Sequence, residues 1–169
     1  FGEIKPKKGL DLVLETLDLT KYTLRIVGRL SDTTSKQLHG FLTLYPDLQS
    51  RITVVPYLKK HLELLAEYEL ADIVCLPSLH DGMPNVMLEA MSCGKIVVAS
   101  DVGGALDVID SGTNGFLFER GNSDALAAAI HAADKELQDP ERRVQNAART
   151  TIEEKFNGTK ERQAYGQLL

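Results

Sequence analysis

Residues 77–100 read PSLHDGMPNVMLEAMSCGKIVVAS, and this stretch is the most informative part of the chain. The apolar run 72–76 before it predicts a buried strand. A loop with glycine and proline follows, and then a short helix over about 84–93, where proline suits the first helical position. A second apolar strand, 96–99, comes directly after the helix. In a parallel α/β sheet this order places the loop at the carboxyl end of the first strand, where ligands bind.

Strands and helices alternate along almost the whole chain. Such alternation predicts an α/β fold, with a Rossmann-like parallel sheet and helices on both faces. The strands are continuous apolar runs, as expected for a sheet that is covered on both sides. The predicted strands are 22–27, 51–55, 72–76, 96–99 and 115–119. Helices are predicted after Gly9, around the apolar stripes within 38–45 and 62–68, over about 103–109, and around the stripe within 126–137, which Asn122 or Ser123 caps. A last helix is predicted to start at Asp139-Pro140 and to end near 156–158.

Length and composition indicate one ordinary soluble domain, or a domain with a tail, in 169 residues. The net charge of −5 gives no electrostatic reason to bind nucleic acid or an anionic membrane. Two cysteines, Cys75 and Cys93, do not suggest a disulfide framework, so a reducing compartment is favoured. The chain begins with Phe1, within what reads as the end of a strand, and we expect it to be a fragment of a longer protein.

Two carboxylates, Asp81 and Glu89, lie eight positions apart across the junction between the loop and the helix. The first turn of a helix has backbone N–H groups without partners, and these attract an anion. Ionised carboxylates only accept hydrogen bonds, so they suit hydroxyl groups beside that anion. A nucleotide sugar has both features.

Each of these features also has a simpler structural explanation. Glu89 points away from the apolar arc of its helix, which is typical of a solvent-exposed carboxylate, and Asp before Gly is common in turns. The loop would have the same conformation if it were only the start of a helix and bound no ligand. If the loop binds a phosphate, the candidate backbone donors are Gly82, Met83 and Asn85, because Pro84 has no N–H.

The stretch 81–94 resembles the donor-site signature of retaining GT-B glycosyltransferases of the large family 4 group, roughly E-G-x-(G/P)-x-x-x-x-E-A-M-x-x-G. Asp81 stands where the family usually has Glu, and Glu89 and Gly94 fill the later positions.

Three further segments extend the resemblance to about residue 130. Residues 2–9 are similar to the family's G-R-x-x-x-x-K-G turn, with Lys8 at the phosphate-contacting lysine and Glu3 in place of Arg. Residues 101–107 resemble its x-V-G-G-x-x-E turn, and residues 111–118 its D-G-x-N-G-x-L-x segment. The last two segments are landmarks of the fold and are not expected to supply chemical groups to the reaction.

The resemblance implies the carboxy-terminal, donor-binding domain of a GT-B glycosyltransferase over residues 1–155, with its first strand truncated. The tail, 156–169, is expected to cross back to an amino-terminal domain that holds the acceptor. The implied reaction moves a sugar, of the hexose type, from a nucleoside diphosphate to an acceptor hydroxyl with retention of the anomeric configuration. The isolated domain is expected to be inactive.

The resemblance also assigns roles to single residues. Asp81, beside the transferred sugar, and Lys8, at the leaving diphosphate, are the catalytic candidates. Glu89 would accept hydrogen bonds from the ribose hydroxyls. The nucleotide-sugar-binding candidates are Gly82, Met83, Asn85, Glu89 and Lys5. Lys5 is included because Lys5 or Lys7 would compensate for the carboxylate of Glu3.

No Asp-x-Asp motif and no Cys/His cluster with metal spacing occurs in the sequence. We therefore expect no metal and no other cofactor, with the nucleotide sugar as the partner and no nucleic acid or membrane contact from this domain. The expected location is the cytoplasm or the cytoplasmic face of a membrane, in polysaccharide or glycolipid biosynthesis.

Two other interpretations remain open. A degenerate module that binds nucleotide or a partner without turnover is favoured by Glu3 and Asp81. A sugar-nucleotide epimerase of similar architecture has no matching residue.

Overall fold

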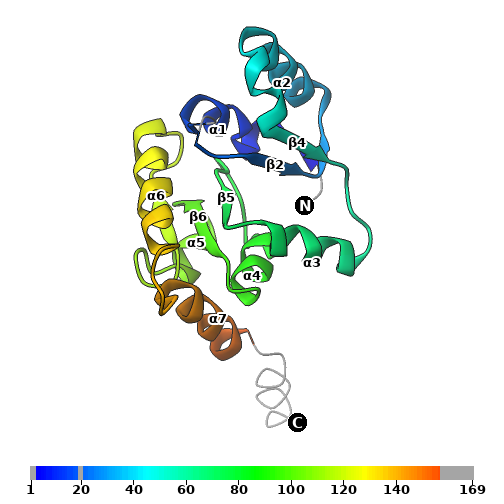
Figure 1. The fold of residues 1–169 in the computed structure, drawn as a ribbon. Helices are drawn as coiled ribbons and strands as arrows, with labels where there is room; N and C mark the ends of the chain where they lie inside the picture. Colours follow the sequence, from blue (N-terminus) through cyan, green and yellow to red (C-terminus); the bar gives the residue numbers. More distant parts are fainter. Residues whose placement is uncertain (1–2, 19–20, 157–169) are drawn as a thin grey trace.

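The computed structural model describes residues 3–18 and 21–156, and it confirms the alternation of strands and helices (Figure 1). In chain order the elements are β1 (Glu3–Ile4), the 3₁₀ helix η1 (Pro6–Lys8), α1 (Leu10–Thr16), β2 (Leu24–Val27), β3 (Arg29–Leu30), α2 (Asp32–Leu44), the 3₁₀ helix η2 (Pro46–Arg51), β4 (Ile52–Val55), α3 (His61–Leu70), β5 (Ile73–Leu76), α4 (Asn85–Ser92), β6 (Ile96–Ser100), α5 (Ala105–Val108), β7 (Phe116–Phe118), α6 (Ser123–Glu136) and α7 (Arg143–Lys155). Apart from Phe156, which ends α7, the predicted tail lies outside the described residues.

Every strand pair is parallel, as the sequence predicts. The ladders, however, form three separate parts: β1 with β3, β2 with β4, and β5 with β6 and β7. Within the described residues, no ladder joins β2 to β5. Figure 1 shows β2 beside β4 and, apart from them, β5 beside β6, with helices on both sides of the strands.

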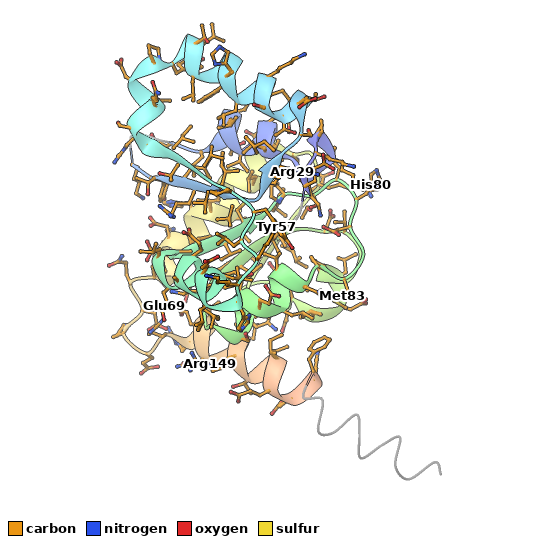
Figure 2. The ribbon with its side chains drawn as sticks, turned by 90° about the vertical axis from the view of Figure 1, so that its right-hand side faces the viewer. Arg29, Tyr57, Glu69, His80, Met83 and Arg149 are labelled. Carbon is orange, nitrogen blue, oxygen red and sulfur yellow. The ribbon has the colours of Figure 1, made fainter. Side chains whose placement is uncertain are left out.

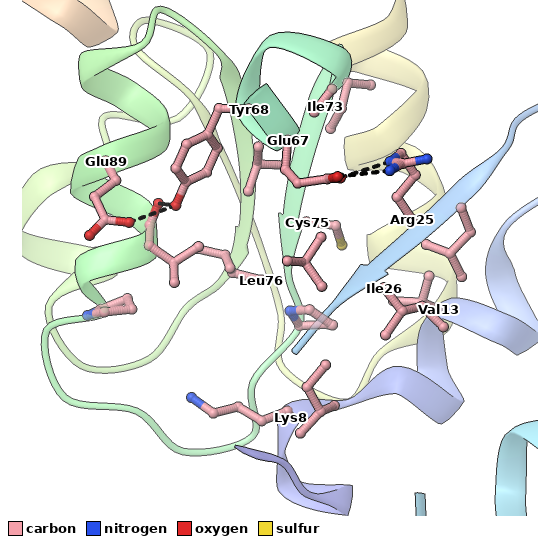
Figure 3. Close-up of a pocket in the computed structure, with 18 of the residues that line it drawn as sticks. Lys8, Val13, Arg25, Ile26, Glu67, Tyr68, Ile73, Cys75, Leu76 and Glu89 are labelled. Carbon is pink, nitrogen blue, oxygen red and sulfur yellow. Dashed lines mark hydrogen bonds and ion pairs between the residues drawn. The ribbon is translucent and has the colours of Figure 1, made fainter. Parts of the chain in front are cut away.

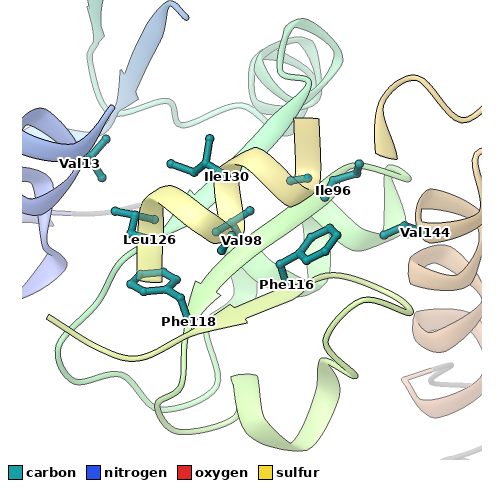
Figure 4. Packing of buried hydrophobic residues seen from close by; sticks show 10 residues of the cluster. Val13, Ile96, Val98, Phe116, Phe118, Leu126, Ile130 and Val144 are labelled. Carbon is teal, nitrogen blue, oxygen red and sulfur yellow. The ribbon is translucent and has the colours of Figure 1, made fainter. Parts of the chain in front are cut away.

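The strand β6 lies at the centre of the core and is buried along its whole length. Its side chains alternate between two apolar clusters. Ile96 and Val98 face the first cluster, which includes Leu126 and Ile130 of α6 and Phe116 of β7 (Figure 4). Residues 97 and 99 face the second cluster, which α3, α4, α5 and α7 cover. This two-sided burial confirms the expectation of a sheet with helices on both faces.

The signature helix and the last helix begin later than the sequence predicts. The signature helix begins at Asn85, because Pro84 is its extended N-cap. The last helix begins at Arg143, three residues beyond Pro140. Asp139 accounts for the second difference, because its carboxylate accepts hydrogen bonds from the N–H groups of Glu141 and Arg143 and thereby stabilises a turn ahead of the helix.

Candidate functional site

A groove with a volume of about 940 Å³ runs between β2 and β5, and we call it the β2–β5 groove (Figure 3). Its lining extends to the loop that follows β5 and to the exposed side of α4. Five predicted site residues lie along it: Lys8, Asp81, Met83, Asn85 and Glu89. The parallel arrangement explains this, because η1 follows β1 and the loop follows β5, so both lie at carboxyl ends of strands.

Lys8 and Asp81 are in direct contact, although 73 positions separate them. The ammonium Nζ of Lys8 lies 2.5 Å from Oδ2 of Asp81. Backbone packing brings them together: the N–H of Leu79 donates to the carbonyl oxygen of Lys7 at 2.8 Å. Gly9 has a φ of +71°, and a Cβ there would lie 2.1 Å from the carbonyl oxygen of Pro77. Glycine is therefore required for this approach.

The carboxyl group of Asp81 is partly buried, and burial alone would raise its pKa. The hydrogen bond and charge of Lys8 act in the opposite direction, and Ser78 Oγ and the N–H of Gly82 also donate to the carboxylate. These contacts together lower the pKa of Asp81 below its usual value of 3.8. Asp81 is thus a carboxylate at neutral pH and Lys8 its counter-ion.

The glycine pair 103–104, a predicted landmark, supports the loop from behind. Gly103 has a φ of +52°, and a Cβ there would lie 2.1 Å from the carbonyl oxygen of Asp81. The N–H of Gly104 donates to the carbonyl oxygen of Gly82 at 2.8 Å. The backbone of the loop at Asp81 and Gly82 is therefore held in place by a second loop that follows β6.

Glu89 does not lie on a freely solvated helix face. It is half-buried, and its Oε2 accepts a hydrogen bond of 2.8 Å from the phenol of Tyr68 on α3 (Figure 3). The ring of Tyr68 is 4% exposed and packs in the second core cluster. Burial is the main cause that raises the pKa of the Tyr68 phenol, and the hydrogen bond to Glu89 raises it further. The phenol therefore stays protonated and acts as a donor. The core residue Tyr68 thus fixes the position of one oxygen of Glu89, and Glu89 itself lines the groove.

Of the other predicted residues in and after the loop, two line the groove and one does not. Met83 and Asn85 line the groove, and Met83 projects from the loop on the same side of the molecule as His80 (Figure 2). Gly82 is not part of the lining, and its N–H already donates to Asp81. Helix α4 has no side-chain cap at Pro84. The first turn of α4 is therefore the better candidate for an anion.

Lys5 does not line the groove. Its ammonium group pairs with Glu3 at 3.1 Å, and Arg29 lies 3.8 Å from the other oxygen of that carboxylate. Both cations therefore compensate the charge of Glu3, which does line the groove.

Tyr68 is the site residue that sequence reasoning missed. Its position in an apolar stripe marks it only as a core residue, and a contact with Glu89 across 21 positions has no local signal. Among residues 3–18 and 21–156, no three His, Cys, Asp or Glu side chains are grouped as a metal site would require. None of the helices in the described part of the chain is both long and apolar enough to span a bilayer.

The fold and the arrangement of the groove define the class of protein: a Rossmann-like, carboxy-terminal half of a GT-B glycosyltransferase. Sequence comparison gives the same answer. The family Glycosyl transferases group 1 matches residues 1–134, and the chain belongs to this family.

Two relatives illustrate the match. The D-inositol 3-phosphate glycosyltransferase of Mycobacterium ulcerans is 30% identical over 132 residues, which are 76% of this chain and 28% of that protein. The crystal structure of Anabaena Alr3699/HepE in complex with UDP superimposes with a TM-score of 0.82 at 26% identity, over 99% of this chain and 47% of that one.

A third comparison concerns the fold alone. The carboxy-terminal domain of the group 1 glycosyl transferase LpcC from Francisella tularensis superimposes with a TM-score of 0.76 at 22% identity, over 92% of this chain and 83% of that one. The chain spans 16–35% of the length of the curated relatives that it matches first.

Proposed function

We propose that this chain binds the donor in a glycosyltransferase that moves a sugar from a nucleoside diphosphate to an acceptor hydroxyl with retention of configuration. A single observation carries the proposal. A cation, a carboxylate, an uncapped helix N-terminus and a second carboxylate line one groove, in Lys8, Asp81, the start of α4 and Glu89. These groups match the diphosphate, the sugar and the ribose of one extended ligand.

The nucleotide part of the proposal is supported by similarity. Anabaena HepE, 26% identical, has been crystallised with UDP. In the proposed complex, Glu89 accepts hydrogen bonds from the ribose hydroxyls with the oxygen that Tyr68 does not occupy. Two free acceptor positions on one carboxylate suit a vicinal diol.

In the proposed reaction, the bond between the sugar and the diphosphate breaks with charge developing on the leaving phosphate. Lys8 and the N–H groups at the start of α4 would stabilise this charge, because they are fixed before the reaction begins. Loss of one such donor typically lowers the rate by about 10²–10³. Asp81 would hold the sugar hydroxyls and, in the absence of donor, keep Lys8 ion-paired.

The acceptor, in this proposal, binds to an amino-terminal domain, and the reacting centre lies between the two domains. Holding both substrates in one geometry is worth about 7–11 kcal/mol. The 169-residue chain alone is therefore expected to bind donor but to transfer no sugar. No metal ion has a part in the proposed reaction.

The second candidate, a module that binds without turnover, is favoured by one observation. Glu3 adds a carboxylate to the groove where the family has arginine, and the nearby Lys5 and Arg29 are engaged in pairing with it. Turnover by the full-length protein distinguishes the two functions.

The first test is an NMR titration of the chain with UDP, GDP, ADP and inorganic pyrophosphate. We expect one nucleoside diphosphate to bind with a Kd of about 10⁻⁴–10⁻³ M, or about 4–5.5 kcal/mol. Glu89→Ala should weaken nucleotide binding but leave pyrophosphate binding unchanged, and Lys8→Ala should weaken both.

Matched controls are available on other helices. Glu153→Ala on α7 and Lys36→Ala on α2 remove the same charges at exposed positions outside the groove, and should change neither affinity. Equal losses for nucleotide and pyrophosphate in Glu89→Ala would refute the ribose assignment.

A further inference from the structure

Two buried serines lie behind Asp81 and have no role in the proposed reaction. Ser78 is in the loop that follows β5, and Ser100 is the last residue of β6. Ser78 is 5% exposed and Ser100 is 1% exposed. A buried hydroxyl group is costly unless it finds a hydrogen-bond partner. The partners of these two hydroxyl groups therefore show what each serine holds in place.

The hydroxyl group of Ser100 holds the chain where it leaves the sheet. The ladder between β5 and β6 ends at the pair Leu76 and Ala99. Beyond this pair, Ser100 Oγ donates to the carbonyl oxygen of Ser78 at 2.5 Å and lies 3.4 Å from the carbonyl oxygen of Leu76. Pro77 cannot extend the ladder, because proline has no N–H. A side chain of β6 therefore replaces the missing ladder bonds and fixes the backbone of Ser78.

The hydroxyl group of Ser78 connects this backbone to the site. Its Oγ donates to Oδ2 of Asp81 at 3.2 Å, and Lys8 contacts the same oxygen. The N–H of Gly82 donates to Oδ1 at 3.1 Å. Burial raises the pKa of the Asp81 carboxyl, whereas Lys8, Ser78 and Gly82 lower it. Of the two side chains on Oδ2, only Lys8 carries a charge that a diphosphate would attract, so Ser78 is the donor that would remain.

We propose that Ser78 and Ser100 are positioning residues that fix the carboxylate of Asp81 for the sugar of the donor. Ser100 fixes the backbone of Ser78, and the hydroxyl group of Ser78 fixes Oδ2 of Asp81. The assignment to the sugar rests on the proposed function, because the sugar is the part of the ligand that Asp81 would hold.

This arrangement determines how many sugar hydroxyls Asp81 can hold. A carboxylate has about four acceptor positions. Among residues 3–18 and 21–156, the donors on this carboxylate are Lys8, Ser78 and Gly82, so one position remains, on Oδ1. When Lys8 turns to the leaving diphosphate, a second position opens on Oδ2, and Ser78 keeps the carboxylate in its plane. One free position on each oxygen suits two neighbouring hydroxyls of one sugar ring.

The first test needs no ligand. It follows the carboxyl carbon of Asp81 by NMR through an acid titration of the 169-residue chain. Ser78→Ala removes one donor from the ionised form, so it should raise the pKa of Asp81 toward the ordinary value of 3.8. Ser78→Thr keeps the hydroxyl group and should keep the pKa. Ser100→Ala should also raise the pKa of Asp81, because it releases the backbone of Ser78.

Ser92→Ala is the matched control, because this exposed hydroxyl group on α4 donates to the carbonyl oxygen of Glu89 and not to Asp81. A serine with a purely structural role would lower the Tm on substitution but leave the pKa of Asp81 unchanged. An unchanged pKa in Ser78→Ala would therefore overturn the proposal, and an unchanged pKa in Ser100→Ala would overturn the role of Ser100. An equal rise in Ser92→Ala, or a rise that persists in Ser78→Thr, would also overturn the proposal.

The second test adds the donor. UDP, GDP and ADP are each compared with UDP-glucose, GDP-glucose and ADP-glucose by NMR titration. For the nucleotide that binds, Ser78→Ala should weaken the glucose ester about 2- to 12-fold, the effect of one hydrogen bond, and leave the free diphosphate unchanged. Equal weakening of both ligands would overturn the assignment to the sugar. If none of the ligands binds while the pKa of Asp81 rises as expected, the proposed function is contradicted and the role of the serines is supported.

Discussion

The hydrogen bond from Tyr68 to Glu89 provides the sharpest test of the site. Tyr68→Phe removes the phenol oxygen, 2.8 Å from Oε2 of Glu89, and leaves the ring in its core cluster. Without this donor, the glutamate must be ordered by the ligand, which costs about 0.5–1.5 kcal/mol for one flexible side chain. The affinity for the nucleoside diphosphate should therefore fall about 2- to 12-fold.

The assay is the NMR titration with nucleoside diphosphate, carried out as a double-mutant cycle. Tyr68→Phe should have no effect on affinity in a Glu89→Ala background, and none on pyrophosphate binding in either background. Tyr45→Phe, at an exposed tyrosine that ends α2, is the control for loss of a phenol. Equal weakening of pyrophosphate and nucleotide binding by Tyr68→Phe, or an effect that persists without Glu89, would refute the role of the Tyr68–Glu89 hydrogen bond.

Four further predictions concern the loops, the core and activity. Gly9→Ala places a Cβ 2.1 Å from a backbone oxygen of Pro77 at positive φ, so it should lower the free energy of unfolding by about 1–3 kcal/mol and weaken pyrophosphate binding; unchanged values in denaturation and titration would contradict the packing argument. Asp81 has a lowered pKa, so its ionised form stabilises the fold above about pH 4 and this contribution is lost as the pH falls through the folded pKa. Asp81→Asn should therefore make the free energy of unfolding less dependent on pH on the acid side. The same substitution frees Lys8 and should tighten pyrophosphate binding several-fold. A steeper dependence on the acid side would show that the ion pair does not stabilise the fold. Leu126→Ala, at a fully buried position, should cost about 3 kcal/mol and lower the Tm by roughly 6–12 °C in calorimetry, whereas a loss below about 1 kcal/mol would show that the first cluster is loosely packed. The isolated chain should give no sugar transfer with any donor and acceptor, and steady turnover in a product assay would overturn the two-domain proposal.

Local patterns in the sequence account for most of the fold. The apolar run 96–99 predicts a strand buried on both faces, and β6 is buried in that way with alternating contacts to two clusters. Helix α6 follows from its apolar stripe and from the cap Asn122, whose side chain accepts from the N–H of Ala125. These features depend on residues a few positions apart, so they can be read from the sequence directly.

Short polar contacts decide where an element begins, and the sequence was less reliable there. The sequence predicts that the last helix starts at Asp139-Pro140. The carboxylate of Asp139 instead binds two backbone N–H groups and delays the helix to Arg143. Whether a side chain caps a helix or stabilises a turn before it depends on geometry that composition does not reveal.

By itself, the sequence determined the α/β class, the loop at the carboxyl end of β5 and the residues that gather there. Only the tertiary structure decided how these residues are paired. Asp81 forms an ion pair with Lys8, Glu89 accepts a hydrogen bond from Tyr68, and Lys5, which does not line the groove, pairs with Glu3. That no ladder joins β2 to β5 among the described residues is likewise a matter of strand order. Contacts of this kind depend on how distant segments pack and on strand register, and periodicity within one segment carries no information about either.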